Sequence, residues 1–165
     1  MRSALLACSA AIACCALLAW HPAEAAAGRA GLDHAERKVV RLINRIRARH
    51  GLRRLRASRA LSRAASAHTS DMLRANFLGH GSSNGTPMGS RVRGYTRARW
   101  VGECVAVASR GRRTATRVVR MWMASPPHRA VLLSPRARRI GVGRRGGVMG
   151  GGRQAVYTAD FASRH

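Results

Sequence analysis

MWMASPPHRAVLL, residues 121–133, combines the end of one predicted helix with an abrupt break and a histidine. Residues 114–124 carry apolar side chains at helical spacing. Pro126 and Pro127 cannot continue that helix, because proline lacks a backbone N–H and its ring crowds the preceding turn. We therefore predict a helix over residues 114–124, a break that presents the imidazole of His128, and a single helical turn over residues 130–133.

Two further polar residues stand in apolar surroundings: His80 in FLGHG and Glu103 in WVGECVAV. Two imidazoles and a carboxylate are credible ligands of zinc or another transition metal, and they are equally credible as an acid–base cluster. The three residues are too far apart in sequence to form a local motif. Simpler roles therefore remain open, with the histidines capping turns and Glu103 paired with an arginine. Our hypothesis is that His80, Glu103 and His128 converge in one cleft.

The first 31 residues are predicted to lie outside the folded domain. Arg2, the apolar run 4–20 and the small residues around position 25 are typical of a secretory signal peptide, residues 1–25, removed by cleavage. Residues 26–31 form a linker, and residues 32–165 form one domain. A membrane-anchored form is the alternative, because the apolar run approaches the shortest membrane span. Three of the four cysteines fall in the signal, so Cys104 has no partner for an intramolecular disulfide.

The charge is strongly positive, with 31 Lys and Arg against six Asp and Glu and a formal net charge of +25. Such a field favours anionic partners, in particular anionic cell-envelope surfaces, although a GC-rich genome would also give many arginines. The arginines are spread along the chain without a zinc-finger or aromatic-interleaved pattern. Specific nucleic-acid binding is therefore not expected. The sequence indicates no oligomeric state.

The remaining pattern predicts an α+β domain. Helices are expected from Asp33 to the glycine at 51 and from Ser58 onward, with His68 on the apolar face of the second as a core histidine bonded to the backbone. A loop spans 77–94, and a buried strand spans 100–108. Strands 139–143 and 154–161 are antiparallel and joined by a glycine-rich loop, 144–152. Helices then cover both faces of a small sheet.

A nucleophile is harder to find. Ser125 lies close to His128 in sequence, but the Gly-x-Ser-x-Gly elbow of many serine hydrolases is absent. Cys104 follows Glu103 on a strand, so the two side chains point to opposite faces, and Cys104 is expected to be an inert core residue. Whether the protein is an enzyme stays open, with catalysis less favoured. His128, Glu103 and Ser125 are the candidates if it is a hydrolase.

Taken in order, several short motifs resemble the CAP superfamily of cysteine-rich secretory, antigen five and pathogenesis-related proteins. The chain is most similar to short bacterial members, the SCP-like extracellular proteins. The resemblance covers residues 32–161 and depends on the following segments: LINRIR (42–47), AHTSDM (67–72), NFLGH (76–80), SSNG (82–85), GE (102–103), WMASPPHR (122–129) and IGVG (140–143).

The resemblance implies a three-layer α-β-α sandwich with a small antiparallel sheet. It also implies a cleft in which His80, Glu103 and His128 bind one divalent metal ion, zinc first and calcium or magnesium as alternatives. The chain departs from the family pattern at Cys104, Ser125 and Val131, where an asparagine, a second glutamate and an asparagine are usual.

On this basis we expect a secreted, non-catalytic protein that binds a metal and a small or lipid-like ligand. The alternatives are a metal-assisted or serine-type extracellular peptidase and a basic protein that adheres to the cell envelope.

Overall fold

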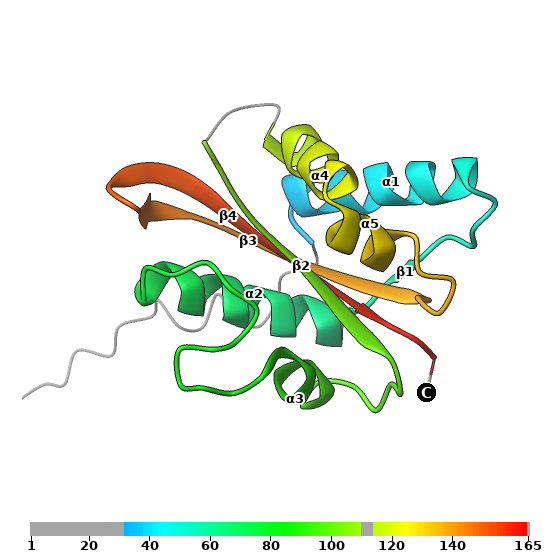
Figure 1. Cartoon of the computed structure of the whole chain (residues 1–165), viewed down its shortest axis with the longest axis horizontal. Helices are drawn as coiled ribbons and strands as arrows, with labels where there is room; N and C mark the ends of the chain where they lie inside the picture. Colours follow the sequence, from blue (N-terminus) through cyan, green and yellow to red (C-terminus); the bar gives the residue numbers. More distant parts are fainter. Residues whose placement is uncertain (1–31, 110–113, 165) are drawn as a thin grey trace, which may run out of the picture. The chain divides into compact units, whose positions relative to one another are not determined.

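The computed structural model describes residues 32–109 and 114–164, so the predicted signal peptide and linker lie outside the described residues. A four-stranded sheet with strand order β1-β3-β4-β2 lies between two helical layers, α2 and α3 on one face and α1, α4 and α5 on the other (Figure 1). The predicted α-β-α sandwich is confirmed. The elements are α1 (His34–Arg49), β1 (Arg56–Ala57), α2 (Arg59–Arg74), α3 (Met88–Arg93), β2 (Val101–Ser109), α4 (Thr114–Ala124), α5 (Pro126–Leu132), β3 (Arg139–Met149) and β4 (Gly152–Ala162).

Both long helices begin where the capping residues predict. At α1, Asp33 accepts a bond from the backbone N–H of Glu36, and the Glu36 side chain accepts one from the backbone N–H of Asp33, each 2.7 Å long. This reciprocal pair satisfies two N–H groups that the helix itself leaves free. At α2, Ser58 is the N-cap, and its hydroxyl accepts from the backbone N–H of Leu61. No helix of the described residues is long and apolar enough to cross a membrane.

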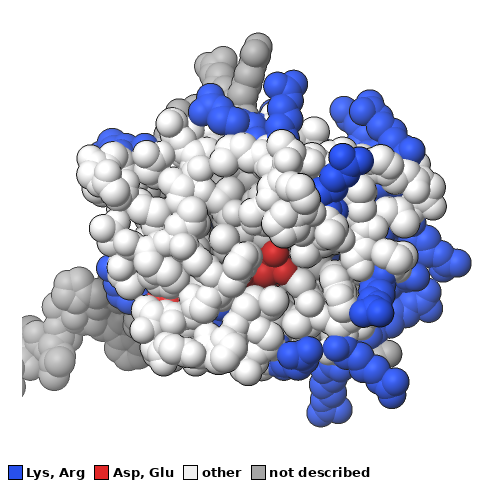
Figure 2. Space-filling model, in the orientation of Figure 1, with Lys and Arg blue, Asp and Glu red and all other residues white. Residues whose placement is uncertain are grey.

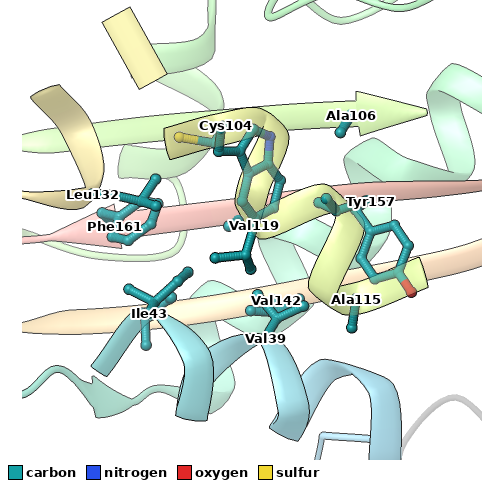
Figure 3. Packing of buried hydrophobic residues seen from close by; sticks show 14 of the residues in the cluster. Val39, Ile43, Cys104, Ala106, Ala115, Val119, Leu132, Val142, Tyr157 and Phe161 are labelled. Carbon is teal, nitrogen blue, oxygen red and sulfur yellow. The ribbon is translucent and has the colours of Figure 1, made fainter. Parts of the chain in front are cut away.

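The larger core lies between the sheet and the layer of α1, α4 and α5 (Figure 3). Val39 and Ile43 of α1 and Val119 of α4 project toward Val142 and Phe161 on the strands, and all five are buried. Apolar side chains that recur every three or four residues on each helix thus meet the apolar face of the sheet.

The same core contains the side chain of Cys104. Burial raises the pKa of its thiol well above the usual range, so the reactive thiolate is not formed at neutral pH. The prediction that Cys104 is an inert core residue is therefore confirmed.

On the opposite face α2 runs unusually close to β3. A Cβ atom added to Gly141 would lie 2.1 Å from backbone atoms of Leu61 and Ser62, and one added to Gly143 would lie 2.4 Å from the backbone N of Ser66. Real Cβ atoms do not approach backbone so closely. The glycines of the IGVG segment therefore allow helix and strand to pack backbone against backbone.

Three local predictions are corrected. The sequence predicts a loop throughout residues 77–94, but this segment includes α3. The sequence also predicts a break at Pro126 and Pro127 before a helical turn over residues 130–133, but the second helix, α5, already begins at Pro126. Pro126 and Pro127 occupy the first turn of α5, where a missing N–H costs nothing because that N–H would have no helical partner. Finally, the sheet is mixed, because the two-residue strand β1 pairs parallel to β3.

The glycine-rich segment 144–152 is also not a loop, which is the fourth correction. β3 continues to Met149, and only Gly150 and Gly151 turn, with φ of 57° and 79°. Two successive positive φ values suit a two-residue hairpin, and glycine adopts them without strain. Pairing with β4 supplies the hydrogen bonds that keep the preceding glycines extended.

The close packing of α2 on β3 can be tested by adding one methyl group. We expect Gly141→Ala to lower the free energy of unfolding by about 3 kcal/mol, because backbone has to move to admit the methyl. The matched control is Gly81→Ala, whose Cβ meets nothing within 4 Å, and it should stay within about 1 kcal/mol of the parent. Urea unfolding followed by circular dichroism measures both. Equal stability of Gly141→Ala and the parent would contradict the packing.

Candidate functional site

Glu103 is the central residue of the site. It lies on β2, an edge strand, and its side chain is fully buried on the face covered by α2 and α3. One carboxylate oxygen accepts a 2.8 Å hydrogen bond from Nδ1 of His80, and the other accepts from the guanidinium of Arg91 on α3. The charge of a buried carboxylate is costly unless it is paired and hydrogen-bonded. Arg91 and His80 provide that compensation.

The loop that carries His80 is fastened to α2. His68 donates from Nε2 to the carbonyl of Gly79 at 2.8 Å, and Asp71 accepts from the backbone N–H and the hydroxyl of Ser83 at 2.8 and 2.6 Å. The prediction of a core His68 bonded to the backbone is confirmed, with 1% of the residue exposed. Burial lowers the pKa of His68, so the ring is neutral at pH 7. His80 is thus held on a tethered loop.

His128 meets His80 from the other helical layer. It lies in the first turn of α5, and its Nδ1 is 2.8 Å from the hydroxyl of Ser125. The ring centroids of His80 and His128 are 6.3 Å apart, with the planes inclined by 45°. Elements of both layers can meet in this way because β2 has no strand on its outer side. The structure therefore brings together the three residues singled out from the sequence.

A second carboxyl group, which the sequence analysis missed, lies next to Glu103. Asp160 on β4 is paired in register with Glu103, is fully buried, and has no hydrogen-bond partner for either oxygen among the described residues. Burial, followed by the charge of Glu103, raises the pKa of Asp160 well above its usual value. Burial thus favours the protonated form of Asp160, which lies beside a Glu103 carboxylate that is paired with Arg91.

The sequence held only a weak signal for the partners of Glu103. Asp160 is the one acidic residue in the predicted strand 154–161, but the register that puts it beside Glu103 could not be read from the sequence. Arg91 is one of 30 arginines, and although it belongs to the segments that resemble the CAP superfamily, its pairing with Glu103 was not predicted. Arg91 also donates to the carbonyl of His80 at 2.8 Å.

The imidazoles of the exposed His80 and the half-buried His128 have opposite electrostatic environments. The hydrogen bond to Glu103 raises the pKa of His80, whose side chain is 52% exposed. Burial, and then the neighbouring charge of His80, lowers the pKa of His128. The pKa values of the two rings are therefore pushed apart, so that as the pH falls His80 takes up its proton before His128 does.

The arrangement only partly fits a metal centre. Among residues 32–109 and 114–164, no group of three or more His, Cys, Asp or Glu side chains is placed to hold a metal ion. Both oxygens of Glu103 are occupied by His80 and Arg91, which makes direct coordination by Glu103 unfavourable. His80 and His128 each use Nδ1 for their hydrogen bond, which leaves Nε2 open to a ligand. A metal site with Glu103 as third ligand stays a prediction.

Comparison with known proteins places this arrangement in a family. The Cysteine-rich secretory protein family (CAP) matches residues 40–161. Uncharacterized protein YkwD of Bacillus subtilis is 36% identical over 109 residues, which are 66% of this chain and 41% of YkwD. An extracellular protein of Bacillus anthracis containing an SCP domain has a TM-score of 0.67 and 25% identity, covering 82% of this chain and 45% of that one. This chain therefore spans less than half the length of these two relatives.

A third similarity extends over nearly the whole of the other protein. An outer surface protein of Borrelia burgdorferi has a TM-score of 0.68 and 18% identity, covering 82% of this chain and 97% of that one. At this identity the similarity is one of fold.

The hydrogen bond between His80 and Glu103 predicts a pH dependence. In Glu103→Gln the pKa of His80 should fall, because the carboxylate that favours the charged ring is gone, while Asp33→Asn, a matched acid removal on α1, should leave it unchanged. NMR titration of the ring protons measures both. Because the pKa of His80 is raised on folding, its contribution to stability is complete below about 6.5 and is lost as the pH rises through the raised value. A pKa of His80 that is equal in Glu103→Gln and the parent would contradict the interaction.

Proposed function

The chain belongs to the Cysteine-rich secretory protein family, and from this premise we propose that it is an exported binding domain in which His80 and His128 hold a divalent transition-metal ion, zinc first, without catalysing a reaction. Export is supported by the sequence of residues 1–25 and by the extracellular and outer-surface proteins of the same fold. A small or lipid-like ligand beside the ion remains the wider expectation from the family.

The observation that carries this proposal is the orientation of the two rings. Each imidazole is held through Nδ1, His80 by the Glu103 carboxylate and His128 by the Ser125 hydroxyl. Each therefore presents Nε2 to a ligand, and the two ring centroids lie 6.3 Å apart. A histidine that binds a metal commonly donates its other N–H to a carboxylate, as His80 does here. A bound ion would supply coordination bonds that join the α2–α3 loop to α5.

In this proposal Glu103 is a positioning residue and not a ligand. It fixes the tautomer of His80 with Nδ1 protonated, which leaves the lone pair on Nε2. Its carboxylate is already paired with Arg91, and burial favours the protonated form of Asp160, so little negative charge remains to attract a cation. Two imidazoles alone then give modest affinity. Binding weakens as the pH falls, because the proton that His80 takes up occupies Nε2.

A serine hydrolase is the second candidate, because the Ser125 hydroxyl lies 2.8 Å from Nδ1 of His128. A neutral His128 could accept the hydroxyl proton. Two features oppose it. Pro126 and Pro127, the residues after the serine, have no N–H to stabilise an oxyanion. Within the described residues, moreover, no carboxylate orients the His128 ring. The pair is better explained as a hydroxyl that positions a ligand histidine.

The metal site is tested by zinc binding under equilibrium dialysis. We expect one ion per chain at neutral pH, and a loss of affinity of at least about tenfold in His80→Ala and in His128→Ala. His50→Ala, which removes an exposed histidine at the end of α1, is the matched control and should bind like the parent. Glu103→Gln should weaken binding less than either ligand variant, since Gln retains the shape but not the charge. Unchanged zinc content in both ligand variants would remove the site.

The hydrolase alternative is tested by labelling with a fluorophosphonate, which reacts with activated serines. We expect no more labelling of the parent than of Ser125→Ala, with or without zinc, because the oxyanion donors are missing. Labelling that Ser125→Ala abolishes, together with turnover of a peptide library that His128→Ala abolishes, would establish the hydrolase in place of the binding domain.

A further inference from the structure

A surface pocket of about 530 Å³ lies at the end of the sheet where β2 begins and β4 ends, and neither His80 nor His128 lines it. Three segments contribute to it: the entry to β2, the α5–β3 loop and the residues after β4. Its lining is Arg99, Trp100, Arg136, Arg138, Ser163 and Arg164. Figure 2 shows Lys and Arg side chains gathered on the right-hand side, where Figure 1 places this end of the sheet. Four guanidinium groups and an indole thus share one concave surface.

The walls of this pocket are fixed by hydrogen bonds. The backbone N–H of Trp100 donates to the Ser163 hydroxyl, and the N–H of Ser163 donates to the carbonyl of Trp100 at 3.0 Å. The α5–β3 loop is held from behind by the fully buried Arg47, whose guanidinium donates to the carbonyls of Leu132 and Ser134 at 2.7 and 3.0 Å. The pocket is therefore formed before any ligand arrives, which reduces the entropy lost on binding.

Within residues 32–109 and 114–164, the arginines of the pocket have no acidic partner. None of the ion pairs among the described residues involves Arg99, Arg136, Arg138 or Arg164. The five described acidic residues lie at the start of α1, on α2 and in the Glu103 site. Burial lowers the pKa of Arg47, and the charge of Arg138 lowers it further, so the charge of this pocket residue is felt in the interior. Four like charges around one hollow repel one another, and an anion bound between them relieves that repulsion.

We propose that this pocket binds a phosphate ester. The planar guanidinium fork donates two parallel hydrogen bonds to phosphate oxygens. Arg138 already donates through Nη1 to the carbonyls of Pro135 and Ala137. The principal donors to a phosphate group are therefore Arg99, Arg136 and Arg164. The half-buried indole of Trp100 offers an apolar surface for the organic part of the ligand. The site shares no residue with the His80–His128 pair, so each proposal can fail without the other. The phosphate comes either from a soluble ester or from a lipid headgroup.

The test uses the chain without its predicted signal peptide, which carries Trp20. Fluorescence of Trp100 then reports on the pocket, because Trp122 is buried and donates from Nε1 to the carbonyl of Val105. The probes are inorganic pyrophosphate for the soluble source and phosphatidylcholine vesicles containing phosphatidylglycerol for the lipid source, titrated at near-physiological salt of about 0.15 M. Arg99→Ser with Arg136→Ser removes two charges from the pocket. The control, Arg41→Ser with Arg45→Ser, removes two exposed charges from α1. Thermal unfolding confirms that both double variants fold.

We expect saturable binding of at least one probe, weakened at least about tenfold in the pocket variant and less than about twofold in the control. Trp100→Phe should abolish the signal. Pyrophosphate binding identifies a soluble ester, and binding of vesicles alone identifies a lipid headgroup. Equal losses in the two double variants would mean adsorption by surface charge only and would overturn the proposal. No saturable response to either probe would also overturn it.

Discussion

The contact on which the site depends is the backbone approach of α2 to β3 at Gly141 and Gly143. It brings α2 down onto the sheet, so that Thr69 bonds across to Thr158 on β4 at 2.9 Å. At this depth the polar side chains of α2 reach the following loop and fix its path through the Gly79 carbonyl and the Ser83 backbone. A helix one side-chain layer farther out could not form these bonds. Two glycines therefore determine where the loop delivers its exposed histidine.

The electrostatics of the site follow from one buried carboxylate. Arg91 and His80 bond to the two oxygens of Glu103, whereas burial and the neighbouring Glu103 raise the pKa of Asp160. Removing one partner of such a buried pair lowers the free energy of unfolding by about 3–5 kcal/mol. Arg91 therefore stabilises the fold as well as the site. The Glu103 carboxylate thus positions the His80 ring through the hydrogen bond to Nδ1. In the function proposed above, the ligand atoms are the Nε2 nitrogens of the two histidines, and His80 depends on Glu103 for its orientation.

Features of the structure that depend on residues close together in the sequence could be predicted. The caps at Asp33 and Ser58 and the apolar spacing along both long helices have short-range causes, and the structure agrees with them. Predictions failed where pairing or packing overrides propensity. Glycines in residues 144–149 disfavour a strand, yet β4 holds them extended. Asp160 acquires its role only through the register of β4 with β2, which sequence patterns of one strand do not contain.

Arg47 has one more consequence, for the use of arginine itself in this chain. Its buried guanidinium donates to four carbonyls, those of Arg53, Leu132, Ser134 and Ala137, and none of these bonds involves a carboxylate. A compact ammonium has fewer donors and gives up its proton more readily when desolvated. Most surface arginines could be exchanged for lysine at little cost, which would make the chain easier to cross-link or label. At Arg47 the same exchange would remove hydrogen bonds that join α1 to the end of α5 and to the loop before β3.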